Sequence, residues 1–281
     1  MASNVSDILS ETAPRRGWSR YRHPRSTIRF GVLLAVLAFL AWSTAFLNID
    51  LYRLLGAFPR LAEILATRYY PPDISYISNA DFIYSVVQTL EMSLLGGFLG
   101  VCLAIPMAWF AAYNITLGRR IAYPLARFAI VGCRSIHEMI WTILFVTVLG
   151  FGMLAGTLAL TVFCIGFAGK LFADELEAID MGPVEALRSA GANPLQVFQY
   201  GVVPQIRVAF VGIAIYTWDV AFRAATVVGF FGGGGMGWYL KRTTQQLEST
   251  RVAAILLTII VLVLLAELGS GWLRRRISRM R

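Results

Sequence analysis

Long apolar runs alternate with shorter polar segments along the chain, and this pattern predicts a membrane protein. Six runs reach the length of about 20 residues that a helix needs to cross the hydrocarbon core of a bilayer. They cover roughly Phe30–Leu47, Phe82–Tyr113, Ile121–Leu149, Met153–Phe172, Val208–Val228 and Val252–Trp272. The second run is too long for a straight crossing, so we expect it to tilt or to extend beyond the core. The pattern predicts an all-α, polytopic fold with six transmembrane helices.

The composition supports this fold class. Hydrophobic residues make up 57% of the 281 positions and charged residues 15%, which is far from the balance of a soluble domain. The three cysteines, Cys102, Cys133 and Cys164, lie inside the apolar runs without metal-ligand spacing. We expect them to be small buried residues, and we expect no metal and no cofactor in this chain. The first run follows a largely polar lead of 29 residues without a clear cleavage site, which favours a retained anchor over a secretory signal.

The distribution of the basic residues predicts the orientation in the membrane. The net charge is +9, and arginines concentrate before the first run, between the second and third runs, and after the last run. Cytoplasmic segments of membrane proteins carry this excess, so we expect both termini in the cytoplasm. Residues 1–29 then form a basic arm that contacts anionic lipid, and residues 30–281 form the transmembrane domain. Nucleic-acid binding is not expected, because no basic soluble unit is present.

A polar insertion between the fourth and fifth runs, about residues 174–206, has the turn chemistry of two short helices. Asp180 and Gly182 precede Pro183, which suits the first helical position, and Gly191 can end the helix in the left-handed conformation. Asn193-Pro194 repeats the start signal, and we expect Pro204 to close the second helix. By the charge count, this elbow lies on the cytoplasmic side.

Glu185, Ala186, Gly191 and the apolar run that ends at Pro204 resemble the EAA loop of permease subunits in binding-protein-dependent ABC importers. Leu187 stands where the motif has its second alanine, and the spacing is kept. The resemblance implies that this loop contains a coupling helix that docks on a cytoplasmic ATPase. The competing interpretation is an amphipathic connector at the membrane surface with no partner.

Further segments resemble the phosphonate-importer permease family. They are Arg134–Glu138, with His137 where relatives often have proline or asparagine, Gly169–Leu171, Glu177–Ala186, Ala225–Phe230, and the glycines of 232–237. The resemblance implies a type I ABC-importer permease fold in a bacterial inner membrane. It also implies two copies of an ATPase that binds ATP and Mg²⁺, a second permease copy in a homodimer, and an extracytoplasmic binding protein for phosphonates or related oxyanions.

Charged residues inside the apolar runs are costly and often mark a substrate path or a buried pair. Arg134 and Glu138 are four residues apart, as are Asp219 and Arg223, so each pair can neutralise itself along one helix face. The alternatives of a path for an anion and of structural ion pairs both stay open. Lys170 is a third cationic candidate for the path, with snorkelling to the interface or packing at the loop as the favoured interpretation.

The glycine run Gly232–Gly237 does not match a phosphate-binding P-loop, because Trp238 follows where a Gly-Lys-Ser/Thr segment is required. We expect a tight or flexible extracytoplasmic turn. The small and β-branched residues just before it, with Ala225 and Val228 as candidates, are expected to form a gate.

The function predicted from these features is ATP-driven import of phosphonate or a related phosphorus oxyanion, such as phosphite or phosphate, by alternating access. ATP hydrolysis is expected in a separate chain, since no Walker motif is present. The alternative is a secondary transporter or channel for small anions driven by an ion gradient, which inverted repeats or half-helices would favour. A membrane enzyme is the least supported class, because no catalytic cluster is seen. The residues do not distinguish among the phosphorus oxyanions.

Overall fold

The structure is a computed structural model that describes residues 24–47, 51–116 and 120–278. All secondary structure in these residues is helical, and none of them lies in a β-strand. The chain divides into two units, Met1–Ile64 and Leu65–Arg281. Most of the predicted basic arm, residues 1–29, lies outside the described residues. All of the candidate functional residues belong to the second unit.

The first unit contains two helices. Helix α1 (Pro24–Phe46) includes the apolar stretch Ile28–Phe46, which is long enough to span a membrane and has no buried residue. Helix α2 (Leu51–Ile64) lies between the first and second apolar runs. It carries the exposed apolar residues Phe58 and Leu61 beside Arg60 and Glu63. This mixed composition is typical of a helix that lies along a membrane surface.

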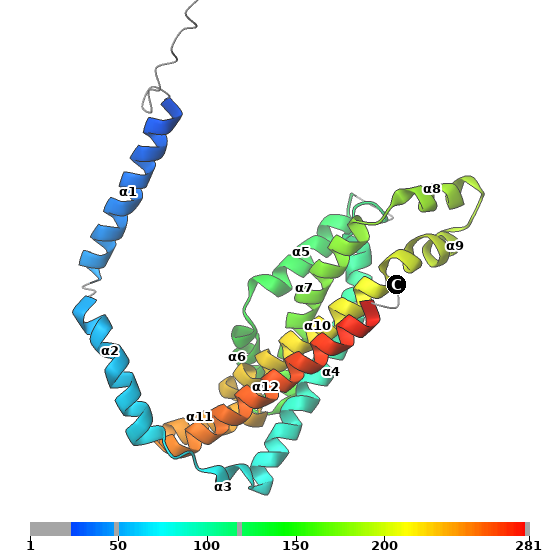
Figure 1. Cartoon of the computed structure of the whole chain (residues 1–281). Coiled ribbons are helices and arrows are strands. Elements are labelled where there is room, and N and C mark those ends of the chain that lie inside the picture. The colour runs from blue at the N-terminus through cyan, green and yellow to red at the C-terminus, as the bar shows by residue number, and fades with distance from the viewer. Residues whose placement is uncertain (1–23, 48–50, 117–119, 279–281) are drawn as a thin grey trace, which may run out of the picture. The chain divides into compact units, whose positions relative to one another are not determined.

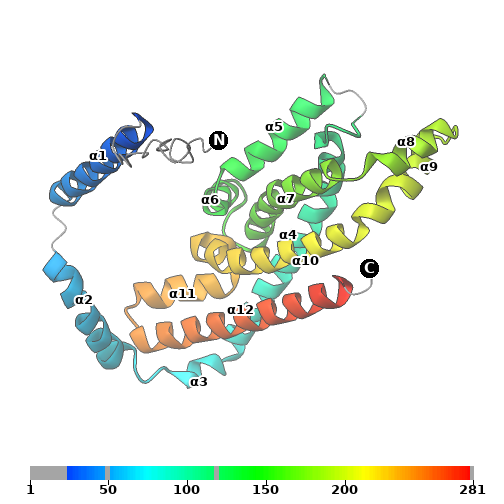
Figure 2. The ribbon, with the colours of Figure 1, turned by 45° about the horizontal axis from the view of Figure 1, so that its top comes forward.

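The second unit is a helical bundle built around α7 (Met153–Glu177), as Figures 1 and 2 show. Three more long helices pack with it: α4 (Ala80–Ala111), α10 (Val203–Val228) and α12 (Ser249–Ser278). More than half of the most apolar window of α7 is buried, against 17% for α12. Helix α7 is therefore the core of the bundle, and α12 presents most of its apolar surface outward.

Small residues allow α4 and α7 to approach closely. A Cβ atom added at Gly96 would lie 2.8 Å from Cβ of Leu160, and one added at Gly100 would overlap Cβ of Cys164. Without a hydrophobic driving force inside a bilayer, such close van der Waals packing is a main source of helix association. Gly96 and Gly100, four residues apart, thus form a small-residue face on α4.

The third predicted span, Ile121–Leu149, is wrong as a single helix. It consists of α5 (Ala122–Ser135) and α6 (Glu138–Leu149), which meet at an angle of 89°. The last turn of α5 lies against α7, where a Cβ atom at Gly166 would come within 2.8 Å of the Arg134 backbone nitrogen. Counting this pair once, the described residues contain up to six spans, five of them single long helices.

The bundle ends differ in character. At one end lie the short helices α8 (Met181–Ser189) and α9 (Pro194–Gln196); at the other lie α3 (Ile74–Ile77) and α11 (Gly235–Gln245), as Figure 1 shows. The predicted glycine turn is ordered: the backbone N–H of Met236 donates to Thr89 Oγ1 over 2.8 Å. Three glycines there have positive φ, +110° at Gly232, +91° at Gly234 and +67° at Gly235, which a residue with a Cβ atom rarely adopts.

Asp73, which directly precedes α3, connects this end of the bundle to the start of α12. Its carboxylate lies 3.5 Å from Nε of Arg251, and its backbone N–H donates to the carbonyl of Thr250. A hydrogen bond from Ser75, followed by the one from Arg251, lowers the pKa of Asp73 below its ordinary value. The segment before α3 is thus bonded to the start of the last span.

Candidate functional site

The polar elbow begins at a capped helix start. The side chain of Asp180 accepts a hydrogen bond of 2.9 Å from the backbone N–H of Gly182, which makes Asp180 the N-cap of α8. Helix α8 therefore begins at Met181, and Pro183 is its third residue instead of its first. A proline is tolerated there because the first four N–H groups of a helix have no partner within the helix.

The entry of the elbow is also bonded to its exit. The side chain of Gln205 accepts from the backbone N–H of Asp180 over 2.9 Å and donates to the Asp180 carbonyl over 3.1 Å. One side chain thus satisfies both backbone groups of a residue 25 positions away. Sequence reasoning missed Gln205, because an isolated glutamine gives no signal until the fold places it opposite a free backbone pair.

The corner of the elbow follows the predicted turn chemistry. Gly191 has a φ of +85°, and the backbone N–H of Ala192 donates back to the Leu187 carbonyl over 3.0 Å. Asn193 and Gln196 then form a reciprocal capping box, with distances of 2.8 and 2.9 Å. Caps of this kind stabilise a helix by about 1 kcal/mol. The predicted corner at Gly191 and the second start at Asn193-Pro194 are confirmed.

The predicted end of the second helix at Pro204 is wrong. After α9 the chain forms a π-helical turn, η2 (Val197–Val202), and continues directly into α10, so Pro204 lies in the first turn of α10. Proline normally interrupts a helix, because it lacks an N–H and clashes with the carbonyl four residues earlier. The π-helical turn shifts the hydrogen-bond register just before Pro204. As a result, the chain stays helical from Pro194 until Gly232, where a φ of +110° breaks the helix.

The elbow rests on the bundle through one face of α8. Val184 is 1% exposed, whereas Glu185 and Ala186 are exposed to the outside. Gly201 lies beneath α8, where an added Cβ atom would meet Leu187 at 3.2 Å and Val184 at 3.4 Å. Burial of Val184 therefore orients α8 so that Glu185 and Ala186 point away from the bundle.

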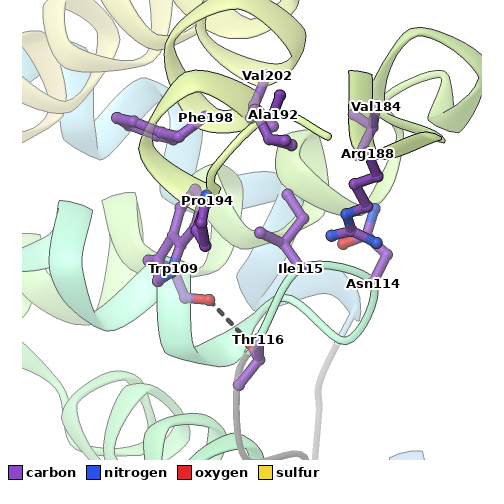
Figure 3. Close-up of a pocket in the computed structure, with 11 residues that line it drawn as sticks. Trp109, Asn114, Ile115, Thr116, Val184, Arg188, Ala192, Pro194, Phe198 and Val202 are labelled. Atoms are coloured by element: carbon purple, nitrogen blue, oxygen red, sulfur yellow. Dashed lines mark hydrogen bonds between the residues drawn. The ribbon is translucent and has the colours of Figure 1, made fainter. Parts of the chain in front are cut away.

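A cavity of about 370 Å³ lies between the elbow and the end of α4 (Figure 3). Trp109 of α4 packs edge-to-face on Phe198, with ring centroids 4.8 Å apart. Arg188 of α8 extends toward Asn114, as Figure 3 shows. Nδ2 of Asn114 donates to the Leu176 carbonyl over 2.8 Å. The aromatic pair and Asn114 join the elbow to the ends of α4 and α7.

An ion-pair network holds the neighbouring helix ends together. Nη2 of Arg127 lies 2.7 Å from Glu177, Nη1 lies 3.7 Å from Asp174, and Nε donates to the Ala111 carbonyl over 2.8 Å. Lys170 joins the network through Asp174, at 2.6 Å. Lys170 is therefore paired near the elbow, as expected for packing at the loop. A contact with substrate stays a prediction for this residue.

The pair Asp219–Arg223 forms along one face of α10, as the spacing predicted. Nη2 of Arg223 donates to Oδ2 of Asp219 over 3.0 Å. The Asp219 side chain is 3% exposed and that of Arg223 44%. The other carboxylate oxygen, Oδ1, has no hydrogen-bond partner among the described residues. The pair thus anchors a half-exposed guanidinium on a buried carboxylate.

The pair predicted between Arg134 and Glu138 is wrong, because the 89° bend separates these residues on two helices. Oε2 of Glu138 instead lies 3.3 Å from Nδ1 of His137. The His137 side chain also caps α6 by accepting a long, 3.4 Å bond from the Met139 N–H. Arg134 is exposed, and within residues 24–47, 51–116 and 120–278 no carboxylate pairs with it.

The two gate candidates lie in the interior of the bundle. Ala225 and Val228 are fully buried in a cluster with Met92 of α4 and Leu160 of α7. Their role as a gate stays a prediction. Their burial means that a bulky replacement would act first on the packing of α10 against α4 and α7.

Together these features define a class. A bundle of apolar membrane helices carries a rigid, capped polar elbow at one end and isolated charged side chains among its spans. The described residues hold no group of three or more metal-ligating side chains. This is the architecture of a type I ABC-importer permease.

The comparisons place the chain in a family. Residues 100–279 match the model of the binding-protein-dependent transport system inner membrane component family. This match covers more than half of the chain and includes the elbow and the bent third span. The chain belongs to this family.

Two curated relatives and one solved structure illustrate the similarity. The phosphite transport system permease protein PtxC of Stutzerimonas stutzeri is 39% identical over 92% of this chain and 90% of its own length. The phosphate-import permease protein PhnE of Mycolicibacterium smegmatis is 36% identical over 75% of this chain and 39% of its own length. A chain of the inward-facing MetNI methionine ABC transporter has a TM-score of 0.61 at 23% identity, covering 70% of this chain and 95% of that one. That structure supports the fold alone.

Proposed function

We propose that this protein is the permease subunit of an ATP-driven importer for phosphonate or a related phosphorus oxyanion, such as phosphite or phosphate. The names of its relatives support the substrate class: one is a phosphite transport permease and another a phosphate-import permease. The observation that carries the transport mechanism is the capped elbow α8–α9. In this proposal it docks on a separate ATPase, which binds ATP and Mg²⁺.

The elbow is built to transmit force. Its entry and exit are bonded through Gln205, its corner is fixed at Gly191, and its buried Val184 leaves Glu185 and Ala186 free for a partner. Because α9, η2 and α10 are continuous, movement of the elbow moves the fifth span. A flexible connector would absorb the same movement. The rigid construction therefore favours the coupling role over that of a passive connector.

The proposed path for the anion uses weak cationic contacts. Arg134 and Arg223 are exposed on the bundle, while Asp219 compensates part of the charge of Arg223. Two unpaired arginine forks would hold a phosphonate group tightly, and a substrate that must leave again requires weaker binding. Glu138 and Lys170 are placed at the edges of this path. Alternating access would move Ala225 and Val228 with α10 and so open or close the gate.

The proposed assembly has two copies of this chain, two ATPase subunits and an extracytoplasmic binding protein, in a bacterial inner membrane with both termini cytoplasmic. Pairing of two identical permeases follows the commonest closed symmetry. Tight selection of the substrate would then belong to the binding protein, because few charged groups are available in the permease.

Uptake by proteoliposomes tests the proposal. The full transporter is reconstituted with its binding protein, and uptake of labelled phosphite, methylphosphonate and phosphate is followed with and without ATP. We expect uptake to require both ATP and the ATPase. Uptake driven by an ion gradient without the ATPase would reject the importer and support a secondary transporter. Competition among the three anions then ranks the substrates.

Docking of the ATPase is tested separately through the exposed face of α8. Replacing Glu185 with arginine is expected to reduce the ATPase that copurifies with the permease. The matched control is Glu175→Arg, which reverses the charge of another exposed glutamate close to the same end of the bundle. Equal copurification with Glu185→Arg and the unmodified protein would contradict docking through this face.

A further inference from the structure

A groove of about 420 Å³ lies between α4, α10 and α12. Its walls are apolar: Phe98 from α4, Ile215 and Trp218 from α10, and Leu265 and Leu273 from α12 contribute to them. None of the residues that line it, as the structure describes them, is charged. The hydroxyl of Ser270, which also lines the groove, donates to its own helix at the Glu267 carbonyl. The groove therefore suits a hydrocarbon chain and no polar solute.

One end of the groove is strongly basic. Leu273 is followed directly by Arg274, Arg275 and Arg276 on α12. The guanidinium of Arg274 lies over the ring of Tyr216 of α10, 5.3 Å from its centroid, and that of Arg276 lies 5.3 Å from the Trp272 ring. Stacking on the aromatic rings orients these two cations, both of which follow the groove-lining Leu273 closely on α12.

Arg274 has a donor that the described residues do not satisfy. Its Nε is buried and makes no hydrogen bond. A buried donor without a partner is costly, and a charged one more so, which indicates that an acceptor other than the described residues completes the site. No ion pair of the described residues joins a carboxylate to Arg274 or Arg276. The missing acceptor is therefore expected to be an anion.

We propose that this groove holds one acyl chain of an anionic phospholipid whose phosphate is bound by Arg274. The apolar walls suit the acyl chain and the basic end suits the headgroup, so the site matches both parts of one phospholipid. Basic clusters next to spans attract anionic lipid in this way. The inference depends on the membrane location of the chain and does not depend on which solute it carries.

Lipid-specific quenching of Trp218 fluorescence tests the proposal. The full transporter is placed in phosphatidylcholine nanodiscs that contain an increasing mole fraction of phosphatidylglycerol brominated on its acyl chains. The fluorescence of Trp218 is obtained by subtracting the fluorescence of a Trp218→Phe variant. We expect brominated phosphatidylglycerol to quench Trp218 at lower mole fraction than brominated phosphatidylcholine does. Unlabelled phosphatidylglycerol should relieve the quenching, whereas inorganic phosphate and glycerol phosphate should not.

Two variant pairs separate the headgroup contact from the acyl-chain contact. Arg274→Gln should weaken the preference for phosphatidylglycerol roughly fivefold, while Arg207→Gln, an exposed arginine at the start of α10, should leave it unchanged. Gly269→Leu should fill the groove, because no atom lies within 4 Å of an added Cβ there, and should abolish Trp218 quenching. Gly271→Leu, which does not line the groove, is its control.

Several results would overturn the proposal. Equal quenching by both brominated lipids, or equal effects of Arg274→Gln and Arg207→Gln, would exclude a specific anionic headgroup. Absence of Trp218 quenching would mean that a second copy or another segment of the chain covers the groove. If Arg274→Gln does not assemble, the Gly269→Leu and Gly271→Leu pair still decides whether an acyl chain occupies the groove.

Discussion

Two sharp corners interrupt the helices of the bundle, one at the elbow between α8 and α9 and one between α5 and α6. At the elbow, Asp180, Gly191 and the Asn193–Gln196 box supply caps and a positive φ within 17 residues. At the α5–α6 bend, Ser135-Ile136-His137 contain neither glycine nor proline. That bend instead depends on Gly166, about thirty residues later, and on a bond of 3.4 Å from Trp141 Nε1 to the Cys133 carbonyl. The elbow is thus fixed by local chemistry and the bend by tertiary packing.

The largest effect is expected at the contact that holds the bend. Gly166→Leu would drive a side chain into the α5 backbone, 2.8 Å from the Arg134 nitrogen, and neither helix backbone can yield easily. Overpacking of this kind costs about 1–3 kcal/mol or more. We expect a clear drop in the thermal unfolding midpoint of the purified transporter and a changed distance between spin labels on α5 and α6.

The control for the bend is Gly132→Leu, on the same helix α5. An added Cβ at Gly132 meets no heavy atom within 4 Å, so the same increase in size is accommodated. Equal destabilisation by both leucines would show that contact with α7 does not hold the bend.

The corner of the elbow comes next in size. Gly191 has open space around its Cβ position, so a replacement acts through backbone strain at φ +85° alone. A residue with a Cβ costs about 1–2 kcal/mol in the left-handed region, and Asn tolerates it best. We expect Gly191→Val to reduce ATP-dependent uptake and ATPase copurification strongly, and Gly191→Asn to reduce them little. Identical losses for Val and Asn would indicate that the glycine acts by contact and not by conformation.

The capping box should contribute less than the corner. Asn193→Ala removes the acceptor for the Gln196 N–H, a change that costs about 1 kcal/mol. Hydrogen exchange should therefore quicken at residues 194–202 and stay unchanged in α7. Asn193→Ser, which keeps a capping oxygen, is the matched comparison. If both variants exchange alike, the box does not stabilise the second half of the elbow.

The smallest effect is expected at the cap within the bend. The bond from the Met139 N–H to His137 Nδ1 is 3.4 Å long, beyond the usual N–H···O range of about 2.7–3.2 Å. His137→Ala should therefore shift the unfolding midpoint less than Asn193→Ala does. A larger shift of the unfolding midpoint for His137→Ala than for Asn193→Ala would show that the bend depends on its local cap.

The sequence predicted what local patterns encode. Apolar runs located the spans, and turn residues located the elbow, because a left-handed glycine or a capping asparagine acts on its immediate neighbours. The Asp219–Arg223 pair was predictable for the same reason, since its spacing of four holds on any regular helix. The apolar length of residues 121–149 gave no sign of a corner, because a run of that length fits one tilted span equally well.

What the sequence could not reveal depends on distant partners. The Arg134–Glu138 prediction failed because it assumed a regular helix across the 89° corner, where the last turn of α5 packs against Gly166 of α7. The end predicted at Pro204 failed because a π-helical turn compensates for the proline. Gln205 and the ion pairs of Arg127 with Asp174 and Glu177 emerged only from the assembled bundle. The Lys170–Asp174 pair has the same spacing of four as Asp219–Arg223 and was open to prediction.

The helix that runs from Pro194 until the kink at Gly232 has a thermodynamic consequence. At about 1.5 Å per residue it measures on the order of 55 Å, nearly twice the hydrocarbon thickness of a bilayer. One end carries the elbow and the other carries the glycine turn. Coupling between two binding sites is reciprocal. A partner that binds more tightly to one position of the glycine end must therefore change the affinity of the elbow for its own partner by the same factor, so the helix conveys information in both directions.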